Sequence, residues 1–178
     1  MTVKKKLLGE DRRAKLLHIL KTSEKPVTGT ELARIAHVSR QVIVGDITLL
    51  KAKQEPIVAT AQGYMYFANP PLQQSFEKIV ACLHGPTRTE EELNLLVDFG
   101  ITVKDVTIEH PVYGDLTASI MVSSRKEVQQ FLEKIAETKA AFLSELTEGI
   151  HLHTLIALSE ELLEEAEEAL RKANLLVE

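Results

Sequence analysis

The stretch Glu148-Gly-Ile-His151-Leu-His153-Thr-Leu-Ile-Ala157 decides how the second half of this chain is interpreted. Its apolar residues predict a β-strand over 150–157, in which successive side chains point to opposite faces. His151 and His153 then lie on one face of the strand. Two imidazoles on one face are half of a metal site or half of a catalytic site, so the rest of the sequence has to be searched for the residues that complete it.

Six further elements surround this strand in the second half of the chain. Strands are expected over 76–84, 103–109 and 116–122, and helices over 89–99, 124–138 and 159–174. Two of the helices begin with the pattern of a capping box, formed by Thr89 with Glu92 and by Ser124 with Glu127. The order β-α-β-β-α-β-α predicts an α/β (α+β) domain of the ferredoxin-like βαββαβ type with one added helix.

The predicted topology brings a third histidine to the strand that carries the other two. In the ferredoxin-like arrangement the first and fourth strands are neighbours, about 4.8 Å apart, and His84 ends the first strand. Glu92, on the following helix, can add a carboxylate oxygen, although its place in the capping box offers a purely structural alternative. Cys82 shares the strand face of His84 and is either a further ligand or a buried, inert thiol.

Three imidazoles and a carboxylate form a donor set that suits a divalent transition metal. Zn²⁺, Ni²⁺, Fe²⁺ and Co²⁺ all accept such ligands, and nothing in the spacing selects among them. The alternative is a set of unrelated core histidines. Two imidazoles on one strand face, with a third at the end of a neighbouring strand, favour the metal site.

The first seventy residues have the pattern of a winged helix-turn-helix domain. Helices are expected over 11–21, from Thr28 or Thr30 to about residue 36, and from the N-cap Ser39 to about Gln54. Two short strands around a turn at Gln62-Gly63 would form the wing. The buried side of the third helix is expected to consist of Val42, Ile43, Ile47, Leu49 and Leu50.

In such a domain the third helix enters the major groove of DNA with its exposed N-terminal side chains. The residues expected to contact DNA are Ser39, Arg40, Gln41, Val44, Thr48, Lys51 and, on the wing, Tyr64. Arg and Gln read guanine and adenine bidentately, whereas Lys51, Lys53 and the run Lys4–Lys6 would contact phosphates. Gly45 either allows a close approach to DNA or is merely tolerated, at a cost of roughly 1 kcal/mol against Ala. The alternative to DNA binding is a winged helix that contacts only protein.

The distribution of charge separates the two halves. Residues 1–70 hold 12 Lys and Arg against 6 Asp and Glu, whereas residues 71–178 hold 9 against 20. A basic first half suits a polyanion, and an acidic second half would be repelled by one. Asn69-Pro70-Pro71 interrupts regular structure, so we expect a DNA-binding domain over 1–70 and a regulatory domain over 71–178.

Composition also restricts where the protein works. The one cysteine excludes an internal disulfide and fits a reducing cytoplasm. The chain has no long uncharged apolar run, which excludes a membrane span, and no apolar segment after the N-terminal lysines, which argues against a secretory signal. We therefore expect a cytoplasmic protein with no membrane partner.

Segments of the sequence resemble a known family of regulators. The stretch from Gly29 to Lys51, with Val-Ser-Arg-Gln at 38–41, resembles the biotin-repressor-like winged helix of bacterial transcription factors. Three later segments, 83–93, 105–114 and 146–154, resemble the 3H (three-histidine) domain. Together they cover nearly the whole chain, which is similar to niacin-responsive repressors of NAD biosynthesis and niacin uptake.

This resemblance implies a homodimeric repressor that binds double-stranded operator DNA with nicotinic acid as co-repressor. It also implies that residues matching His84, Glu92, His151 and His153 hold the metal. We expect three residues to meet the effector, although each has a plainer alternative: Arg88 as a partner for the carboxylate or as a solvated side chain, His110 as a pocket residue or a turn residue, and Tyr113 as pocket wall or core.

Two other functions fit the same residues. In a metalloregulator the metal would itself be the signal, with no organic effector. In a metal-dependent hydrolase fused to a DNA reader, Glu92 would act as the base on a metal-bound water. A fused DNA-binding domain favours sensing over turnover.

Overall fold

The computed structural model describes residues 9–67 and 75–177, and its contacts divide the chain into two compact units between residues 71 and 72. Each unit has a hydrophobic core of its own and is described by itself. The lysine run at 4–6 and the expected break at 69–71 lie outside the described residues. No helix within these two described ranges is long and apolar enough to cross a membrane.

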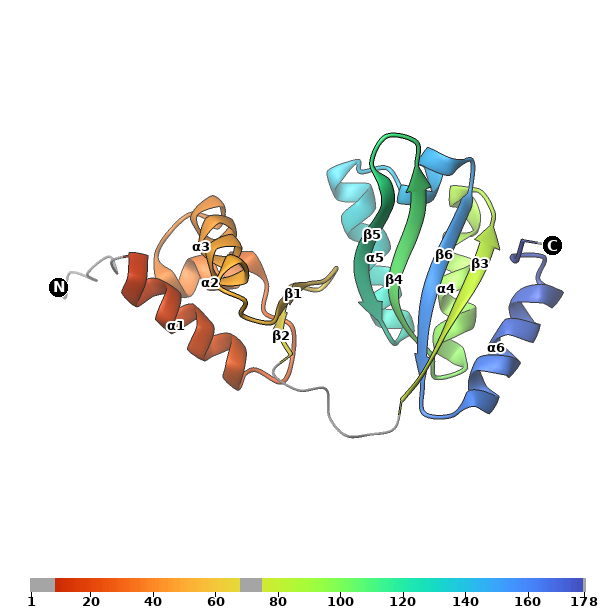
Figure 1. Ribbon diagram of the computed structural model, residues 1–178, viewed down its shortest axis with the longest axis horizontal. Helices are drawn as coiled ribbons and strands as arrows, with labels where there is room; N and C mark the ends of the chain where they lie inside the picture. Colours follow the sequence, from red (N-terminus) through yellow and green to blue (C-terminus); the bar gives the residue numbers. More distant parts are fainter. Residues whose placement is uncertain (1–8, 68–74, 178) are drawn as a thin grey trace. The chain divides into compact units, whose positions relative to one another are not determined.

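The first unit is a winged helix-turn-helix domain (Figure 1). Its elements are α1 (Gly9–Thr22), α2 (Gly29–Ala36), α3 (Arg40–Ala52), β1 (Ile57–Ala59) and β2 (Tyr64–Tyr66). The hydroxyls of Thr28 and Ser39 accept from the backbone N–H groups of Glu31 and Val42, so both residues cap their helices. β1 and β2 pair in antiparallel fashion, and Tyr64 also exchanges two backbone hydrogen bonds of 2.9 Å with Val27.

The core of this unit confirms most of the expected buried side of α3, with two corrections. Ile43, Ile47 and Leu50 are buried, but Val42 and Leu49 are 37% and 50% exposed. These two residues are seven positions apart and therefore share one edge of the helix, beside the buried stripe rather than within it. Asp46 takes a buried position instead, where it accepts from Arg12 Nε at 2.5 Å and joins α3 to α1.

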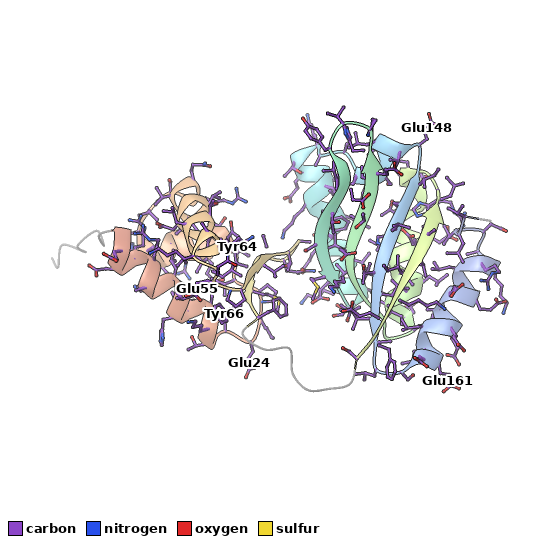
Figure 2. The ribbon with its side chains drawn as sticks, viewed as in Figure 1. Glu24, Glu55, Tyr64, Tyr66, Glu148 and Glu161 are labelled. Carbon is purple, nitrogen blue, oxygen red and sulfur yellow. The ribbon has the colours of Figure 1, made fainter. Side chains whose placement is uncertain are left out.

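The wing is held to the helices by aromatic side chains. Figure 2 shows Tyr64, Tyr66 and Glu55 close together, and the Tyr66 hydroxyl donates to Glu55 Oε2 at 3.0 Å. Tyr64 packs against the core of the unit. Gly63 has a φ of +146°, and a Cβ at this position would lie 2.6 Å from the carbonyl oxygen of Val27, so the turn requires glycine.

The second unit is a four-stranded antiparallel sheet with helices packed on one face (Figure 1). Its strands are β3 (Phe76–Leu83), β4 (Thr102–His110), β5 (Gly114–Val122) and β6 (Ile150–Ala157), and its helices are α4 (Thr89–Asp98), α5 (Arg125–Thr138) and α6 (Glu160–Lys172). Short 3₁₀ helices lie at η1 (Pro86–Arg88) and η2 (Leu143–Thr147). The α+β class and the βαββαβ order with an added helix are confirmed.

The order of strands in the sheet is β3-β6-β4-β5. The first and fourth strands of the unit are neighbours, as predicted, with Cys82 opposite His151 and Val80 opposite His153. The remaining order differs from the ferredoxin-like one, because the fourth strand, not the first, sits inside the sheet and pairs with the second. Both orders use the same sequence of elements, so the chain's pattern alone does not separate them.

Neither of the two capping boxes predicted from the sequence forms as expected. Thr89 is the first residue of α4, not its cap, because Pro86 begins η1 and the helix continues from it. The Ser124 hydroxyl does accept from Glu127 N, but the Glu127 carboxylate bonds Ser123 rather than the cap residue. Ser159 caps α6 as expected. The consequence for Glu92 is that its carboxylate is free of any capping role.

Candidate functional site

Four side chains from three elements meet inside the second unit. His84 follows β3, His151 and His153 lie on the helix-covered face of β6, and Glu92 lies one turn into α4. Their exposed fractions are 6%, 3%, 3% and 0%. Charged and polar groups are rarely buried without partners, so these four residues are expected to interact with one another or with a bound ion.

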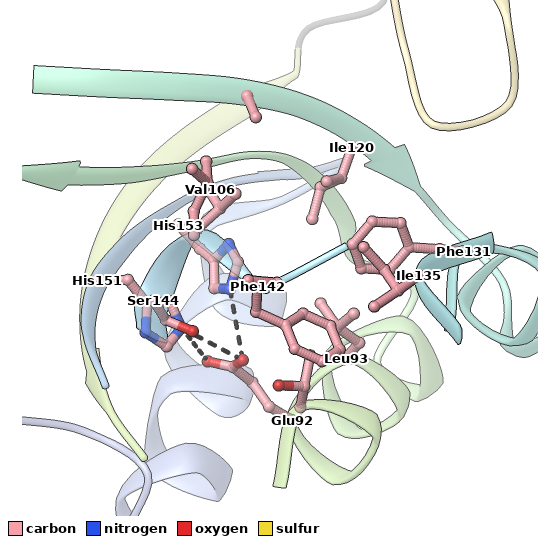
Figure 3. Close-up of a pocket in the computed structure, with 14 residues that line it drawn as sticks. Glu92, Leu93, Val106, Ile120, Phe131, Ile135, Phe142, Ser144, His151 and His153 are labelled. Carbon is pink, nitrogen blue, oxygen red and sulfur yellow. Dashed lines mark hydrogen bonds and ion pairs between the residues drawn. The ribbon is translucent and has the colours of Figure 1, made fainter. Parts of the chain in front are cut away.

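The Glu92 carboxylate lies at the centre of the three imidazoles. Its Oε2 atom is 2.8 Å from His84 Nε2 and 3.4 Å from His153 Nε2, and its Oε1 atom is 3.3 Å from His151 Nε2. Figure 3 shows His151 and His153 directed toward Glu92. The residues predicted from the sequence as metal ligands are therefore all within contact of one carboxylate.

The other ring nitrogens decide which tautomer each histidine adopts. The Nδ1 atoms of His84, His151 and His153 lie 3.0, 2.8 and 2.6 Å from the carbonyl oxygens of Gly85, Gly149 and Asp105. A carbonyl only accepts, so each Nδ1 carries a proton and donates it. In the neutral rings, three Nε2 lone pairs then face the carboxylate, which is a repulsive arrangement unless a cation lies between them.

The electrostatics of the site agree with this requirement. Burial raises the pKa of Glu92, but the three imidazoles outweigh it and hold that pKa well below its ordinary range. Burial lowers the pKa of His84 and His153, and the Glu92 carboxylate more than offsets this, so both pKa values are raised. The site therefore attracts positive charge, whether protons or a metal ion.

These observations fit a divalent transition metal. Apart from the contacts within the cluster given above, His84 Nε2 and Glu92 Oε1 are buried without a hydrogen-bond partner among the described residues, which leaves both as ligand atoms for an ion. Histidines that bind metal through Nε2 usually donate Nδ1–H to a carbonyl or carboxylate, which fixes the ring orientation. The ion would be held by four side chains, those of His84, His151, His153 and Glu92. It would supply a buried positive charge.

The backbone around the site is shaped to bring these side chains together. His84 N donates to Gly149 O at 3.3 Å, and a Cβ at Gly149, whose φ is +97°, would lie 2.5 Å from His84 O. Only glycine allows the start of β6 to approach His84 this closely. A β-bulge between Val103 and Asp105 shifts the pairing of β4 with β6, and the Asp105 carbonyl then meets His153.

Cys82 borders the site without belonging to the histidine cluster. Its Sγ atom and single ligand atoms of Glu92 and His151 lie within 4.8 Å of one another. Burial, followed by the negative charge of Glu92, raises the pKa of the thiol, which is therefore protonated in the metal-free protein. The sequence left open whether Cys82 is a further ligand or an inert thiol, and this spacing is compatible with either role.

A mainly apolar cavity of about 150 Å³ opens onto the imidazoles from the side of α5. Figure 3 shows Val106, Ile120, Phe131 and Phe142 around it, with Glu92, His151 and His153 at one end. The other lining residues are Thr89, Leu93, Ala118, Ile135, Ala141, Leu143 and Ser144. A cavity of this size holds one six-membered aromatic ring.

The three residues expected to meet the effector lie elsewhere and do not line this cavity. Arg88 is held by Glu91 and by the carbonyls of Ala173 and Asn174. His110 Nδ1 accepts from the backbone N–H groups of Val112 and Tyr113 in the turn between β4 and β5, where Tyr113 is 75% exposed. Sequence reasoning missed the lining residues because they come from α4, α5, β4, β5 and η2, with no common local pattern.

In the first unit most of the predicted DNA-contacting residues are exposed to solvent. Ser39, Arg40, Gln41, Thr48 and Lys51 are exposed, and Val44 is half-buried. Tyr64 is half-buried against the core, so its first role is to hold the wing. The exposed Val42, which was expected inside, adds an apolar group next to Arg40 and Gln41, of the kind that contacts thymine methyl groups.

Comparison with known proteins agrees with both units. Residues 12–65 match the model of an HTH domain, and residues 77–178 match the model of the 3H domain. The chain is 60% identical to the transcription repressor NadR of Bacillus subtilis (strain 168) over 178 residues, which covers 99% of each chain. It is 38% identical to the probable transcription repressor NiaR of Thermotoga maritima over 173 residues, 97% of each chain.

Both relatives are regulators of transcription, so this protein is a regulator and not an enzyme, and the hydrolase interpretation of Glu92 is wrong. The order of domains is the one expected from the sequence motifs. The chain therefore belongs to the family of NadR- and NiaR-type transcription repressors, in which a DNA-binding helix-turn-helix domain is followed by a 3H domain.

Proposed function

We propose that this protein represses genes of NAD biosynthesis and niacin uptake, with nicotinic acid as co-repressor bound beside a divalent metal ion in the 3H domain. The observation that carries the proposal is the position of Glu92, His151 and His153 at one end of a cavity the size of an aromatic ring, with His84 Nε2 2.8 Å from Glu92 Oε2 behind them. A metal ion bound there supplies the positive charge that an acid needs in an otherwise apolar pocket.

The chain's own residues divide the work between the two units. Glu92 and the three histidines hold the ion, the apolar wall encloses the ring of the effector, and α3 reads the operator with Arg40 and Gln41. We propose that the protein acts as a homodimer, because helix-turn-helix repressors place two recognition helices about 34 Å apart on two half-sites. Nicotinic acid strengthens repression only if it binds the DNA-competent state more tightly than the other state.

A mobility shift tests this function directly. DNA from upstream of niacin-uptake and NAD-biosynthesis genes is titrated with metal-loaded protein, with and without nicotinic acid, and again after chelation. We expect nicotinic acid to tighten binding and chelation to abolish that effect, while Arg40→Ala weakens binding under every condition. An unchanged shift with nicotinic acid would contradict the proposal.

The second candidate is a metalloregulator, which the buried donor set alone would also support. The same experiment separates the two functions. A shift that depends on added metal and ignores nicotinic acid identifies the metal as the signal.

A further inference from the structure

One polar atom in the cavity wall has no partner within the described part of the chain and no role in the metal centre. Thr89 is 8% exposed and lines the cavity, and its hydroxyl makes no hydrogen bond. The hydroxyl is not a helix cap, since α4 continues from η1 and Thr89 N–H donates to Pro86 O. A buried hydroxyl without a partner is unfavourable, so this one is available to a ligand.

The position of Thr89 relative to Glu92 sets what it can reach. The two residues are three positions apart in α4 and therefore lie on the same face, with their Cβ atoms about 5–6 Å apart. This spacing is close to the width of one aromatic ring. A ring with one end at the metal centre thus presents another edge to Thr89.

The rest of the cavity wall fixes the orientation of an acidic ligand. The 14 lining residues include no lysine or arginine. A carboxylate buried away from positive charge is strongly unfavourable, so it must lie at the end formed by Glu92, His151 and His153 with their cation. The opposite edge of the ring then faces hydroxyl and apolar groups.

We propose that Thr89 selects the effector by donating its hydroxyl hydrogen bond to the ring nitrogen of a monocyclic heteroaromatic carboxylate. This inference rests on the function proposed above and adds the residue that distinguishes a pyridine ring from a benzene ring of the same size and charge. A buried site built to hydrogen-bond a ligand atom rejects the analogue that lacks it, because the site's own polar group is then left unpaired.

Calorimetry with two acids tests the role of Thr89. Metal-loaded full-length protein is titrated with nicotinic acid and with benzoic acid, which has a CH group in place of the ring nitrogen. We expect nicotinic acid to bind roughly tenfold more tightly, the ratio that one hydrogen bond provides. Thr89→Val, which keeps the shape but removes the hydroxyl, should lower nicotinic acid affinity and leave benzoic acid binding at least as tight as in the wild type, so that the preference is lost, whereas Thr89→Ser should retain the preference.

A second readout reports on the hydrogen bond itself. With ¹⁵N-labelled nicotinic acid, the ring-nitrogen resonance of the bound acid should lie upfield in the wild type and in Thr89→Ser relative to Thr89→Val, because accepting a hydrogen bond moves a pyridine nitrogen resonance upfield. Equal unfolding temperatures of the metal-loaded variants would exclude a folding defect as the cause.

The outcomes separate this inference from the proposed function. If the wild type binds neither acid, the proposed function fails and the role of Thr89 falls with it. If both acids bind equally well, or if Thr89→Val keeps the preference, the function stands and Thr89 is not the selecting residue. In the last case, loss of the preference in Ser144→Ala would place the hydrogen bond on the other hydroxyl residue of the wall.

Discussion

A fully buried carboxylate, Glu92, faces the Nε2 atoms of three histidines whose Nδ1 protons are committed to backbone carbonyls. Each backbone hydrogen bond orients one ring, so the direction of every lone pair is set by β-strand or loop backbone and not by the metal. The site is thus preorganised at the level of single residues. Removing one ring should weaken metal binding more than it weakens the fold.

His151→Ala is expected to lose the metal. The substitution removes the nitrogen that lies 3.3 Å from Glu92 Oε1 and leaves two imidazoles and one carboxylate. Elemental analysis after dialysis should give well below one metal equivalent per chain. The matched control is His110→Ala, which removes an imidazole from the turn between β4 and β5 and should keep a full equivalent. Full retention in His151→Ala would contradict the assignment.

The stability of the metal-free protein should pass through a maximum in mildly acidic solution. The pKa of Glu92 lies below its ordinary value of 4.5, so its contribution is present above about pH 4.5 and is lost as pH falls through the lowered pKa. The pKa values of His84 and His153 lie above 6.5, so their contribution is present below that pH and is lost as pH rises through the raised pKa values.

Urea unfolding with a chelator at pH 3, 5.5 and 8 measures this dependence. We expect the largest free energy of unfolding at pH 5.5. With metal the dependence should reverse between pH 5.5 and 8, because the metal competes with protons for the same nitrogens. The variant Glu92→Gln should flatten the metal-free profile, and a wild-type profile that is already flat would contradict the pKa shifts.

At the scale of elements, the recognition helix contains a residue that its own packing does not require. A Cβ at Gly45 would meet no atom within 4 Å, and Gly45 lies on the same exposed face of α3 as Gln41 and Thr48. The glycine costs the helix stability and gains the unit no contact in return. The unit itself therefore does not require glycine here, and the two alternatives from the sequence, close approach to DNA and mere tolerance, can be separated by substitution.

Gly45→Ala should therefore separate stability from DNA binding. The free energy of unfolding should rise by about 1 kcal/mol, while operator affinity falls because a methyl group now stands between the helix and the groove. Chemical unfolding and a mobility shift on the same preparation measure the two effects. Ala14→Gly, at an exposed position of α1, is the control that lowers stability without changing α3. Unchanged or tighter operator binding by Gly45→Ala would show that the glycine is merely tolerated.

The same elements explain how far the sequence could be interpreted. The helices and the wing follow from local periodicity. The pairing of β3 with β6 follows from a neighbour relation that several sheet orders share, and because of this pairing the three histidines and Glu92 could be grouped from the sequence. The prediction that Thr89 caps a helix was wrong, because Pro86 starts a 3₁₀ turn that a four-residue capping pattern does not reveal. The cavity depends on Leu93, Ile120 and Phe142, whose proximity no local pattern encodes.

At the scale of the whole molecule, charge is divided between a basic DNA-binding half and an acidic regulatory half. Like charges repel over roughly a Debye length, about 8–10 Å at physiological salt, so acids of the second unit disfavour DNA wherever the two come that close. Non-specific binding rests on electrostatic contacts alone, so we expect repulsion by the exposed acids of α6 to act mainly against DNA of arbitrary sequence.

Replacing Glu161, Glu164 and Glu165 by Gln should therefore increase affinity for non-specific DNA several-fold at low salt. The change should disappear as salt rises, because screening removes the repulsion in the unmodified protein as well. Competition of random-sequence DNA against operator, for the wild type and the triple variant at two salt concentrations, measures the gain in non-specific affinity and its dependence on salt. Identical competition by the two proteins at low salt would show that the acidic helix has no part in selectivity.

The burial of the ligand set also has a kinetic consequence. Because these four side chains are at most 6% exposed, we expect an ion bound among them to exchange slowly with solution. A small organic molecule in the neighbouring cavity, which has fewer polar contacts to break, should exchange faster. On this expectation the organic molecule would serve as the signal, and the ion would serve as a lasting part of the site.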